Sequence, residues 1–288
     1  MIKVYSREKQ EYIDETQYGE KILIFLYETV IGRAILKVLI NPVTSKIAAL
    51  YKKSFISKLD IKGLVKKYNI DMSLYEDKKY KSFNDFFTRT LKKENIKIDQ
   101  NKEVFISPCD SKVIAYKITG DNLLNIKHST YQLEELVKNQ IDLSDYKNGY
   151  CLIFRLSLDN YHHYCYPDNG ELGDNYKIKG VLHTICSISE KYKIYKENKR
   201  EVTVLKTENF DDIIFIEVGA LVVGDIHNKT ELNFTKGEEK GYFSMGGSTV
   251  VLLVKDKILK LDDDILENSG KGIETKVNYA ERIGRKLN

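Results

Sequence analysis

The residues best placed for covalent chemistry form the run Gly246-Gly247-Ser248-Thr249, near the C-terminus. Glycine reaches backbone conformations that other residues rarely adopt, and the β-branched residues after Ser248 predict a strand that anchors its far side. A serine hydroxyl here can attack the preceding carbonyl carbon and form an ester, a step that backbone strain of about 1–3 kcal/mol would favour. β-Elimination of that ester would then cut the chain after Gly247 and leave Ser248 as dehydroalanine, which takes up water and loses ammonia to become a pyruvoyl group. An ordinary turn before a strand has the same local pattern.

The longer segment Lys236–Thr249 resembles the processing site of the phosphatidylserine decarboxylases, a family of pyruvoyl enzymes. Further similar stretches extend the resemblance over nearly the whole chain; they are Phe83–Arg89, Ile106–Ile114, Leu158–Pro167, Glu217–Asp225 and Gly272–Gly284. The resemblance implies self-cleavage between Gly247 and Ser248 into chains of residues 1–247 and 248–288. Ser248 would be both the nucleophile and the precursor of the pyruvoyl cofactor.

The resemblance also implies roles for two residues upstream. Ile106–Ile114 is similar to the family's Ser-Pro-x-Asp-Gly segment, which makes Asp110 the acidic member of the cleavage site, although Ser111 replaces the usual glycine. Leu158–Pro167 is similar to the motif Asp-Tyr-His-x-x-His-x-Pro and places His162 on its first histidine. Asp110 would orient an imidazole, and His162 would protonate the carbanion left by decarboxylation.

The second histidine of that motif is absent, because Cys165 occupies its position. A thiol with a pKa of about 8.5 is a poorer base near neutral pH than an imidazole with a pKa of about 6.5. His183, in the β-type run Gly180–Cys186, is the candidate to supply the missing imidazole from a neighbouring strand. A core histidine with satisfied hydrogen bonds is the alternative interpretation of His183, and Cys165 is the alternative member of the cleavage site.

Decarboxylation of an amino acid needs an electron sink, which ordinary side chains lack. A pyruvoyl carbonyl condenses with a primary amine and withdraws electrons as carbon dioxide leaves. The resemblance therefore implies phosphatidylserine as the substrate and phosphatidylethanolamine as the product. One rival hypothesis is a serine hydrolase of lipid esters built from Asp110, His162 and Ser248, although the chain lacks its Gly-x-Ser-x-Gly motif. The other is a membrane-binding relative that is neither processed nor active, and both rivals predict an uncleaved chain.

Composition argues against several other classes. The chain has 288 residues, 42% of them hydrophobic, which is enough for a large core. Its 46 basic and 42 acidic residues are too balanced to indicate a nucleic-acid partner. Its cysteines lack the spacing of a zinc site, so we expect no metal and reduced, intracellular thiols. The N-terminus has no signal-like apolar segment, and no run of about 18 apolar residues predicts a membrane span.

The N-terminal third differs from the rest of the chain. Residues 20–40 predict a helix with one apolar face, made of Leu23, Leu26, Tyr27, Val30, Ala34 and Val38. The following segment Lys46–Lys67 holds seven lysines and one aspartate among apolar residues, a composition that suits an anionic bilayer surface. Packing of both segments on the protein's own core is the alternative.

These patterns predict an α+β protein with a helical membrane-associating region, residues 1–92, and a β-rich catalytic domain, residues 93–288. The resemblance implies a mainly antiparallel core similar to a barrel-sandwich, in which Ser248 begins a strand. We expect a peripheral protein on the cytoplasmic side of the cell membrane, bound to an anionic membrane surface. Homodimerisation is an expectation at the level of the family.

Overall fold

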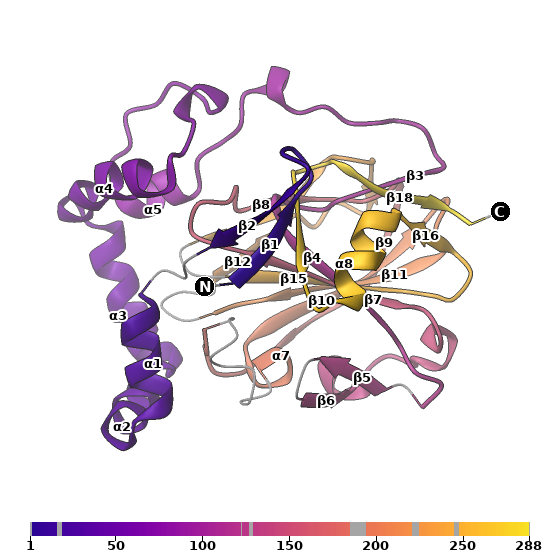
Figure 1. The fold of residues 1–288 in the computed structure, drawn as a ribbon, viewed down its shortest axis with the longest axis horizontal. Helices are drawn as coiled ribbons and strands as arrows, with labels where there is room; N and C mark the ends of the chain where they lie inside the picture. Colours follow the sequence, from indigo (N-terminus) through magenta and orange to yellow (C-terminus); the bar gives the residue numbers. More distant parts are fainter. Residues whose placement is uncertain are drawn as a thin grey trace.

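The computed structural model describes residues 2–15, 19–121, 123–126, 129–184, 194–220, 225–244 and 248–287. Within these residues the chain builds a ten-stranded sheet, two three-stranded sheets and a two-stranded hairpin, with helices α1–α5 on one side of the strands (Figure 1). In order across the large sheet, the strands are β13 (Asn233–Phe234), β9 (Gly170–Ile178), β10 (Arg200–Thr207), β11 (Asp212–Val218), β15 (Ser248–Val254), β7 (Tyr150–Leu156), β4 (Ser111–Lys117), β17 (Glu274–Val277), β1 (Ile2–Ser6) and β2 (Glu11–Glu15).

The smaller sheets pack around this large sheet. Their strands, in order, are β12 (Asp225–Asn228), β14 (Glu239–Ser244) and β8 (His163–Cys165); β16 (Leu259–Leu261), β18 (Arg282–Lys286) and β3 (Val104–Ile106); and the hairpin β5 (Leu123–Ile126) with β6 (Ser129–Gln132). The helices are α1 (Glu20–Glu28), α2 (Val30–Leu39), α3 (Pro42–Lys53), α4 (Leu59–Tyr68), α5 (Phe83–Phe87), α6 (Leu133–Leu136), α7 (Ile194–Glu197) and α8 (Asp263–Gly270), with 3-10 turns at Phe55–Lys58, Met72–Leu74, Lys93–Asn95 and Ser144–Tyr146.

The strand that Ser248 begins lies in the middle of the large sheet, between β11 and β7, and every residue of β15 is buried. Side chains alternate between the two faces of a strand. Val251 and Leu253 join the core on one face, whereas Val250 and Leu252 join the core on the other. Burial on both faces explains why the sequence of β15 is continuously apolar rather than alternating.

The α+β class and the mainly antiparallel pairing are confirmed, and so is the expectation that Ser248 begins a strand. The pairing of β1 with β17 is parallel. Among the described residues the strand order runs openly from β13 to β2, so the likeness to a barrel-sandwich does not extend to a closed barrel.

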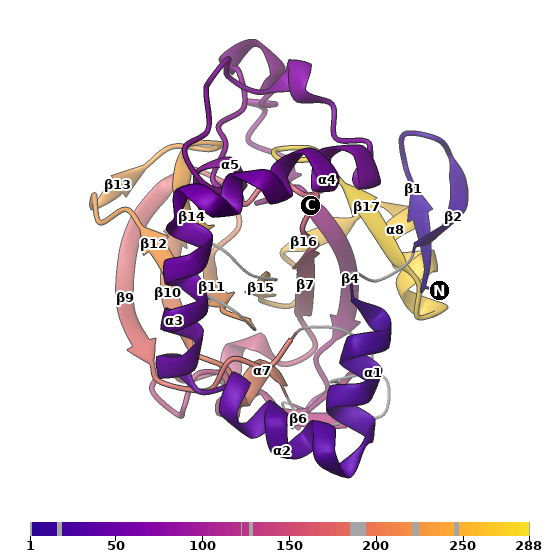
Figure 2. The ribbon, with the colours of Figure 1, turned by 90° about the vertical axis from the view of Figure 1, so that its left-hand side faces the viewer.

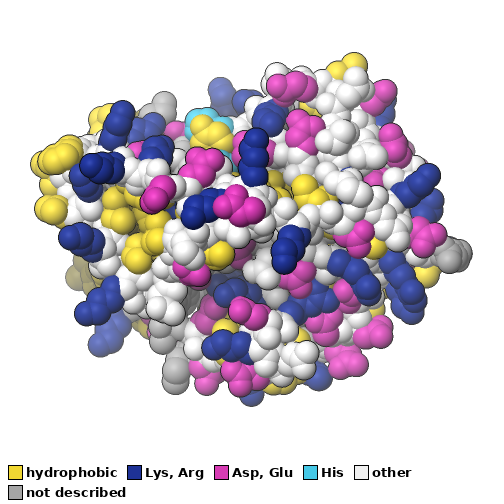
Figure 3. Space-filling view, turned by 90° about the horizontal axis from the view of Figure 1, so that it is seen from above, with side chains coloured by type: hydrophobic (Ala, Val, Ile, Leu, Met, Phe, Trp, Pro, Cys, Tyr) yellow, Lys and Arg dark blue, Asp and Glu magenta, His cyan; other side chains and the backbone are white. Residues whose placement is uncertain are grey.

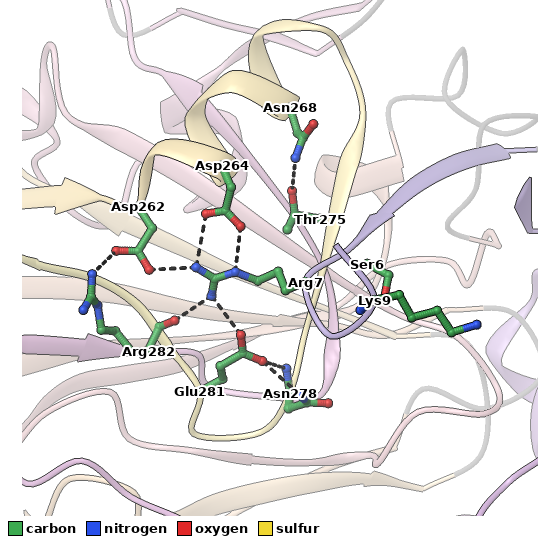
Figure 4. A network of polar contacts seen from close by, with 10 residues as sticks. All are labelled: Ser6, Arg7, Lys9, Asp262, Asp264, Asn268, Thr275, Asn278, Glu281 and Arg282. Atoms are coloured by element: carbon green, nitrogen blue, oxygen red, sulfur yellow. Dashed lines mark hydrogen bonds and ion pairs between the residues drawn. The ribbon is translucent and has the colours of Figure 1, made fainter. Parts of the chain in front are cut away.

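The N-terminal hairpin β1–β2 was not expected, because the sequence analysis assigns residues 1–92 to a helical region. It extends the large sheet and is tied to the C-terminal segment by Arg7, as Figure 4 shows. The Arg7 guanidinium donates hydrogen bonds of 2.7 Å to Asp262 and Asp264, and one of 2.9 Å to Glu281. These three carboxylates all lie C-terminal to Ser248, so this contact joins the two ends of the chain.

The helix predicted over residues 20–40 is interrupted at Thr29, which ends α1 and caps α2 by accepting a 2.9 Å hydrogen bond from the Gly32 amide. Gly32 allows this sharp junction, since a Cβ there would lie 1.9 Å from the Phe25 carbonyl oxygen. The predicted apolar face therefore holds only for α1. Val30 is 76% exposed, because the break changes the direction in which the side chains of α2 point.

Figure 2 views the molecule from the side on which the helices lie, and α1–α5 frame the ends of β15, β7 and β4. No helix among the described residues is long and apolar enough to span a membrane.

Candidate active site

Ser248 is the first residue of β15, and it lies where the neighbouring strands β7 and β11 end. It pairs with Leu156, the last residue of β7, and the adjacent Thr249 pairs with Val218, the last residue of β11. The Ser248 side chain is buried, and its Oγ has no hydrogen-bond partner among the described residues. Gly247, the predicted cleavage partner, lies outside the described residues, so the geometry of the cleavage bond is not described.

Asp110 precedes β4 at the same end of the sheet, with β7 between β4 and β15. Its carboxylate accepts hydrogen bonds from the Asn160 side-chain amide at 2.8 Å and from the Tyr161 backbone amide at 2.9 Å. Asp110 therefore fixes the loop that carries His162, rather than contacting the imidazole itself. Burial raises the pKa of the Asp110 carboxyl, while the Tyr161 amide acts in the opposite direction.

His162 is fully buried, and Phe87 of α5 covers its ring at a centroid distance of 3.8 Å. Its Nδ1 lies 2.9 Å from the Asn160 carbonyl oxygen, which can only accept, so this network assigns the proton of the neutral ring to Nδ1. Nε2 then carries a free lone pair, and it has no partner in the described part of the chain. Burial, together with the positive charge of Arg89, lowers the pKa of His162 well below its ordinary value.

The low pKa of His162 has a consequence for stability in acid. The unfolded chain, in which the histidine pKa is about 6.5, binds this proton before the folded chain does, so acidification favours unfolding. Below about pH 6.5 we expect His162 to remove up to about 1.4 kcal/mol of unfolding free energy per pH unit, which urea unfolding at about pH 7.5 and 5.5 measures. His162→Asn should show a smaller acid loss, while the control His227→Asn should stay closer to the parent, because burial lowers the pKa of this exposed ring less than that of His162. Equal acid losses in both variants would contradict a buried neutral His162.

His183 lies on the other side of Ser248 from His162. The Asn198 side chain binds both polar groups of the His183 backbone. Its Oδ1 accepts from the His183 amide at 3.0 Å, and its Nδ2 donates to the His183 carbonyl at 2.8 Å. The same Nδ2 donates to the Gly219 carbonyl at 2.8 Å. Gly219 directly follows β11, whose last residue pairs with Thr249. Asn198 thus fixes His183 beside the strand end next to Ser248.

The His183 imidazole is buried, and its Nδ1 lies 3.1 Å from the Tyr27 hydroxyl of α1. The Thr184 backbone amide donates to that same hydroxyl at 3.1 Å. Burial lowers the pKa of His183, so the ring is neutral near neutral pH, as a general base must be. Its polar contacts also match the alternative interpretation, a satisfied core histidine.

Cys165 is a poor candidate for a base. Its thiol is fully buried in β8 and donates to the Ser107 carbonyl oxygen at 3.7 Å. Burial raises the pKa of the Cys165 thiol to about 12, so the group stays protonated near neutral pH. A protonated thiol cannot accept the Ser248 proton, and this leaves His183 as the stronger of the two candidates.

The helices contact both halves of this site. Phe87 of α5 packs on His162, and Tyr27 of α1 contacts His183. The buried Arg89, which follows α5 in the chain, donates to the Asp159 carbonyl at 2.7 Å and to the Asn160 carbonyl at 3.2 Å. These two hydrogen bonds hold the loop that carries His162. No local sequence pattern predicts these contacts, because each joins residues that are far apart along the chain.

Known proteins are similar to this chain over most of its length. A family model described as phosphatidylserine decarboxylase matches residues 83–285. A Clostridium acetobutylicum protein named phosphatidylserine decarboxylase proenzyme 2 is 48% identical over 285 residues, which cover 98% of each chain. Proteins named phosphatidylserine decarboxylase proenzyme from Clostridium botulinum and Clostridium beijerinckii are 40% and 38% identical, and each alignment covers 100% of both chains. The chain belongs to the phosphatidylserine decarboxylase family.

Proposed function

We propose that this chain converts phosphatidylserine to phosphatidylethanolamine, using a pyruvoyl group formed from Ser248 when the bond between Gly247 and Ser248 is cut. Membership of the family makes it a decarboxylase, a carboxy-lyase. The observation that supports the proposal most is the place of Ser248: a buried hydroxyl without a partner among the described residues, at the start of a fully buried strand. Two glycines precede it in the sequence.

The residues around Ser248 fit a pyruvoyl group. The group is small, uncharged and derived from the serine itself, so it needs no ligand other than the backbone of β15. When present, it supplies a carbonyl that reacts with the substrate amine and accepts electrons as carbon dioxide leaves. The buried position limits access of water to that carbonyl, which favours electrostatic interactions with the substrate.

His162 is suited to moving a proton during the reaction. The serine headgroup reaches the site as an ammonium ion and has to lose a proton before its nitrogen can react. Nε2 of His162 carries a free lone pair in the tautomer assigned by Asn160, so it can take up this proton. It can then return the proton to the carbon that has lost carbon dioxide. Asp110 contributes by holding the loop that carries His162.

His183 is our proposed base for self-cleavage. It would take the Ser248 hydroxyl proton as Oγ attacks the Gly247 carbonyl. His183 is held beside the end of β11 and the His162 loop follows β7, the two neighbours of β15, which supports the use of different imidazoles for cleavage and decarboxylation.

Conversion of lipid tests this function directly. The purified protein should turn phosphatidylserine in vesicles into phosphatidylethanolamine and release one carbon dioxide per lipid. Hydroxylamine, which condenses with reactive ketones, should abolish the conversion. Cleaved protein that forms no phosphatidylethanolamine would overturn the proposed substrate.

Release of fatty acid instead would favour the hydrolase, but that alternative needs a serine–histidine contact. Neither Ser248 Oγ nor His162 Nε2 has such a partner within the described residues.

We also propose that α1–α4 and the turn between α3 and α4 bind the anionic surface of the cytoplasmic membrane leaflet. Large apolar side chains are exposed all along these elements; they are Ile22, Ile24, Phe25, Val30, Ile31, Ile35, Val38, Val43, Ile47, Leu50, Tyr51, Phe55, Ile56 and Leu59. Figure 3 shows such side chains gathered among lysine and arginine at the end of the molecule where Figure 1 places the helices. An apolar surface among cations suits insertion at an anionic lipid interface.

Two of these residues provide a test of membrane binding. Phe55 is 75% exposed and Leu59 is 81% exposed, and burying each in lipid would contribute about 1.5–3 kcal/mol. We expect Phe55→Asp/Leu59→Asp to weaken binding to phosphatidylserine vesicles at least about tenfold in a flotation assay. The control is Leu232→Asp, because Leu232 is 62% exposed but lies outside these helices. Equal binding by the two variants would contradict the proposed surface.

Two broader features remain proposals that rest on the family and on composition. One is the division into a membrane-associating region, residues 1–92, and a catalytic domain, residues 93–288. The other is assembly into a homodimer, which the molar mass in solution would test.

A further inference from the structure

Arg89 is a buried cation whose hydrogen bonds are incomplete. The residue is 1% exposed. Its Nη2 donates to the Tyr75 hydroxyl at 3.2 Å and to the Asp159 and Asn160 carbonyl oxygens at 2.7 and 3.2 Å. Its Nε and Nη1 are buried without a partner in the described part of the chain. None of the three acceptors carries a negative charge, so the guanidinium has neither an ion pair nor a full set of hydrogen bonds there.

The other buried cations in the described ranges do not share this feature. Two of them pair with a glutamate; they are Lys112 with Glu15 and Lys240 with Glu217. Two others donate to backbone carbonyl oxygens through every side-chain nitrogen; they are Arg200 and Lys236. Arginine is almost never fully buried unless it is paired, and a buried charge without a partner is strongly destabilising. The incomplete pairing of Arg89 therefore points to a ligand.

Aromatic rings account for the burial of Arg89 only in part. The central carbon of its guanidinium lies 4.4 Å from the centroid of the Tyr75 ring and 4.9 Å from that of Phe86 in α5. Such contacts stabilise the positive charge. They leave Nε and Nη1 without an oxygen acceptor, and arginine makes its strongest hydrogen bonds with carboxylate and phosphate. An anion of one of these two kinds is the ligand that fits.

Arg89 lies beside the imidazole that we assign to decarboxylation. The Asn160 carbonyl oxygen accepts from Arg89 Nη2 at 3.2 Å and lies 2.9 Å from His162 Nδ1. Phe87, two residues before Arg89, packs on the His162 ring. An anion bound to Arg89 would thus lie next to the place where the headgroup exchanges its proton in the proposed reaction.

The headgroup of phosphatidylserine carries two anionic groups, a carboxylate and a phosphodiester. The carboxylate loses its charge as carbon dioxide leaves, so a cation bound to it would stabilise the substrate more than the transition state and would slow the reaction. The phosphodiester keeps its charge from substrate to product. Binding it lowers KM and leaves the barrier of the chemical step unchanged. Only three covalent bonds separate its phosphorus from the α-carbon, which keeps that carbon close to His162.

We propose that Arg89 binds the phosphodiester of the lipid headgroup through Nε and Nη1, beside His162. This inference rests on the proposed function, because it takes phosphatidylserine as the ligand. Arg89 is a substrate-binding residue and takes no part in bond making. Since Arg89 and His162 are both buried, the Phe87 ring that covers His162 has to move when the headgroup enters.

The test uses lipids with short acyl chains, kept below the concentration at which they form micelles. The substrate is dihexanoylphosphatidylserine. The main competitor is dihexanoylphosphatidylglycerol, which has the phosphodiester but neither the carboxylate nor the amine. Free serine, which has no phosphate, and inorganic phosphate, which has no acyl chains, are the other two competitors. Arg89→Met removes the guanidinium, and Lys78→Met is the matched control, because Lys78 already pairs with Asp85 of α5 at 2.6 Å.

We expect Arg89→Met to raise both the KM for dihexanoylphosphatidylserine and the inhibition constant of dihexanoylphosphatidylglycerol by about tenfold or more, because charge-assisted hydrogen bonds are lost. The change in kcat should be smaller than the change in KM. Inhibition by serine should stay at the wild-type value, and Lys78→Met should keep every wild-type constant. In the wild type, inorganic phosphate should compete less well than the lipid.

Unchanged constants for both lipids in folded Arg89→Met would overturn the inference. A fall in kcat alone would do the same, because Arg89 would then act only through His162. Weaker inhibition by serine in this variant would show that the carboxylate is the bound group, and equal competition by inorganic phosphate would show a site for free phosphate. Either result would also overturn the proposed ligand.

Thermal melting shows which variants fold, and Arg89→Lys replaces Arg89→Met if the latter does not. The single nitrogen of the lysine cannot serve both the backbone carbonyls and the phosphodiester, so wild-type constants in Arg89→Lys would contradict the inference. A wild type that converts no lipid would instead overturn the proposed function. Calorimetric binding of dihexanoylphosphatidylglycerol to the wild type and to the Arg89 variant would still decide the inference in that case.

Discussion

Ser248→Ala should remain a single chain of 33.4 kDa and should form no phosphatidylethanolamine. Without Oγ there is no nucleophile for the shift, and without the shift no pyruvoyl carbonyl can form. The rate of decarboxylation should therefore fall by the full rate enhancement of the enzyme, which for enzymes in general is at least about 10⁶-fold. Denaturing mass spectrometry and a lipid conversion assay measure the two effects.

The adjacent residue provides the control for that variant. Thr249 is also a buried hydroxyl without a partner among the described residues, but it points to the opposite face of β15. Thr249→Val keeps the shape of the side chain and removes the hydroxyl. It should be cut and should remain active. Cleavage of Ser248→Ala, or an uncut Thr249→Val, would show that the nucleophile has been placed on the wrong residue.

His183→Gln should slow self-cleavage by about 10²–10⁴-fold, the usual contribution of a general base. Cys165→Ala should be cut nearly as fast as the wild type, because the high pKa of that buried thiol keeps it protonated. The rates are measured by the time course of fragment formation after synthesis. The reverse result, slow cleavage in Cys165→Ala and normal cleavage in His183→Gln, would show that the cysteine has taken over the role of the missing histidine.

A pH profile of cleavage gives a second, independent test of His183. Burial lowers the pKa of His183, so its neutral, proton-accepting form predominates down to below the ordinary value of about 6.5. Cleavage by the wild type should therefore be constant around neutral pH and should fall only on the acid side. A rate that rises steadily into the alkaline range would indicate a thiolate or another base with a high pKa.

Local sequence patterns predict the strand at Ser248 well. Glycines followed by β-branched apolar residues are a short-range signal, and so is the turn that places Asp110 directly before β4. The loop with His162 follows β7 as the motif implies. These features depend on neighbouring residues only, and the family resemblance adds the chemistry.

Other features depend on contacts between distant segments, which local patterns do not encode. The hairpin β1–β2 forms because β1 pairs with β17, and this pairing joins opposite ends of the chain. The place of His183 follows from Asn198, which lies 15 residues further along the chain. The buried contact of Lys240 with Glu217 could have been suspected only from a glutamate in a strand that is otherwise apolar after Asp212. The helix break at Thr29 depends on close packing around Gly32.

The most direct test of the central claim is the intact mass of the wild-type protein under denaturing conditions. Two chains that meet at Gly247 and Ser248 are expected, the smaller one with 41 residues (248–288) and a mass of roughly 5 kDa. That chain should be lighter by one ammonia than a chain with a free N-terminal serine, because the pyruvoyl group has lost its nitrogen. A single uncut wild-type chain would contradict the account.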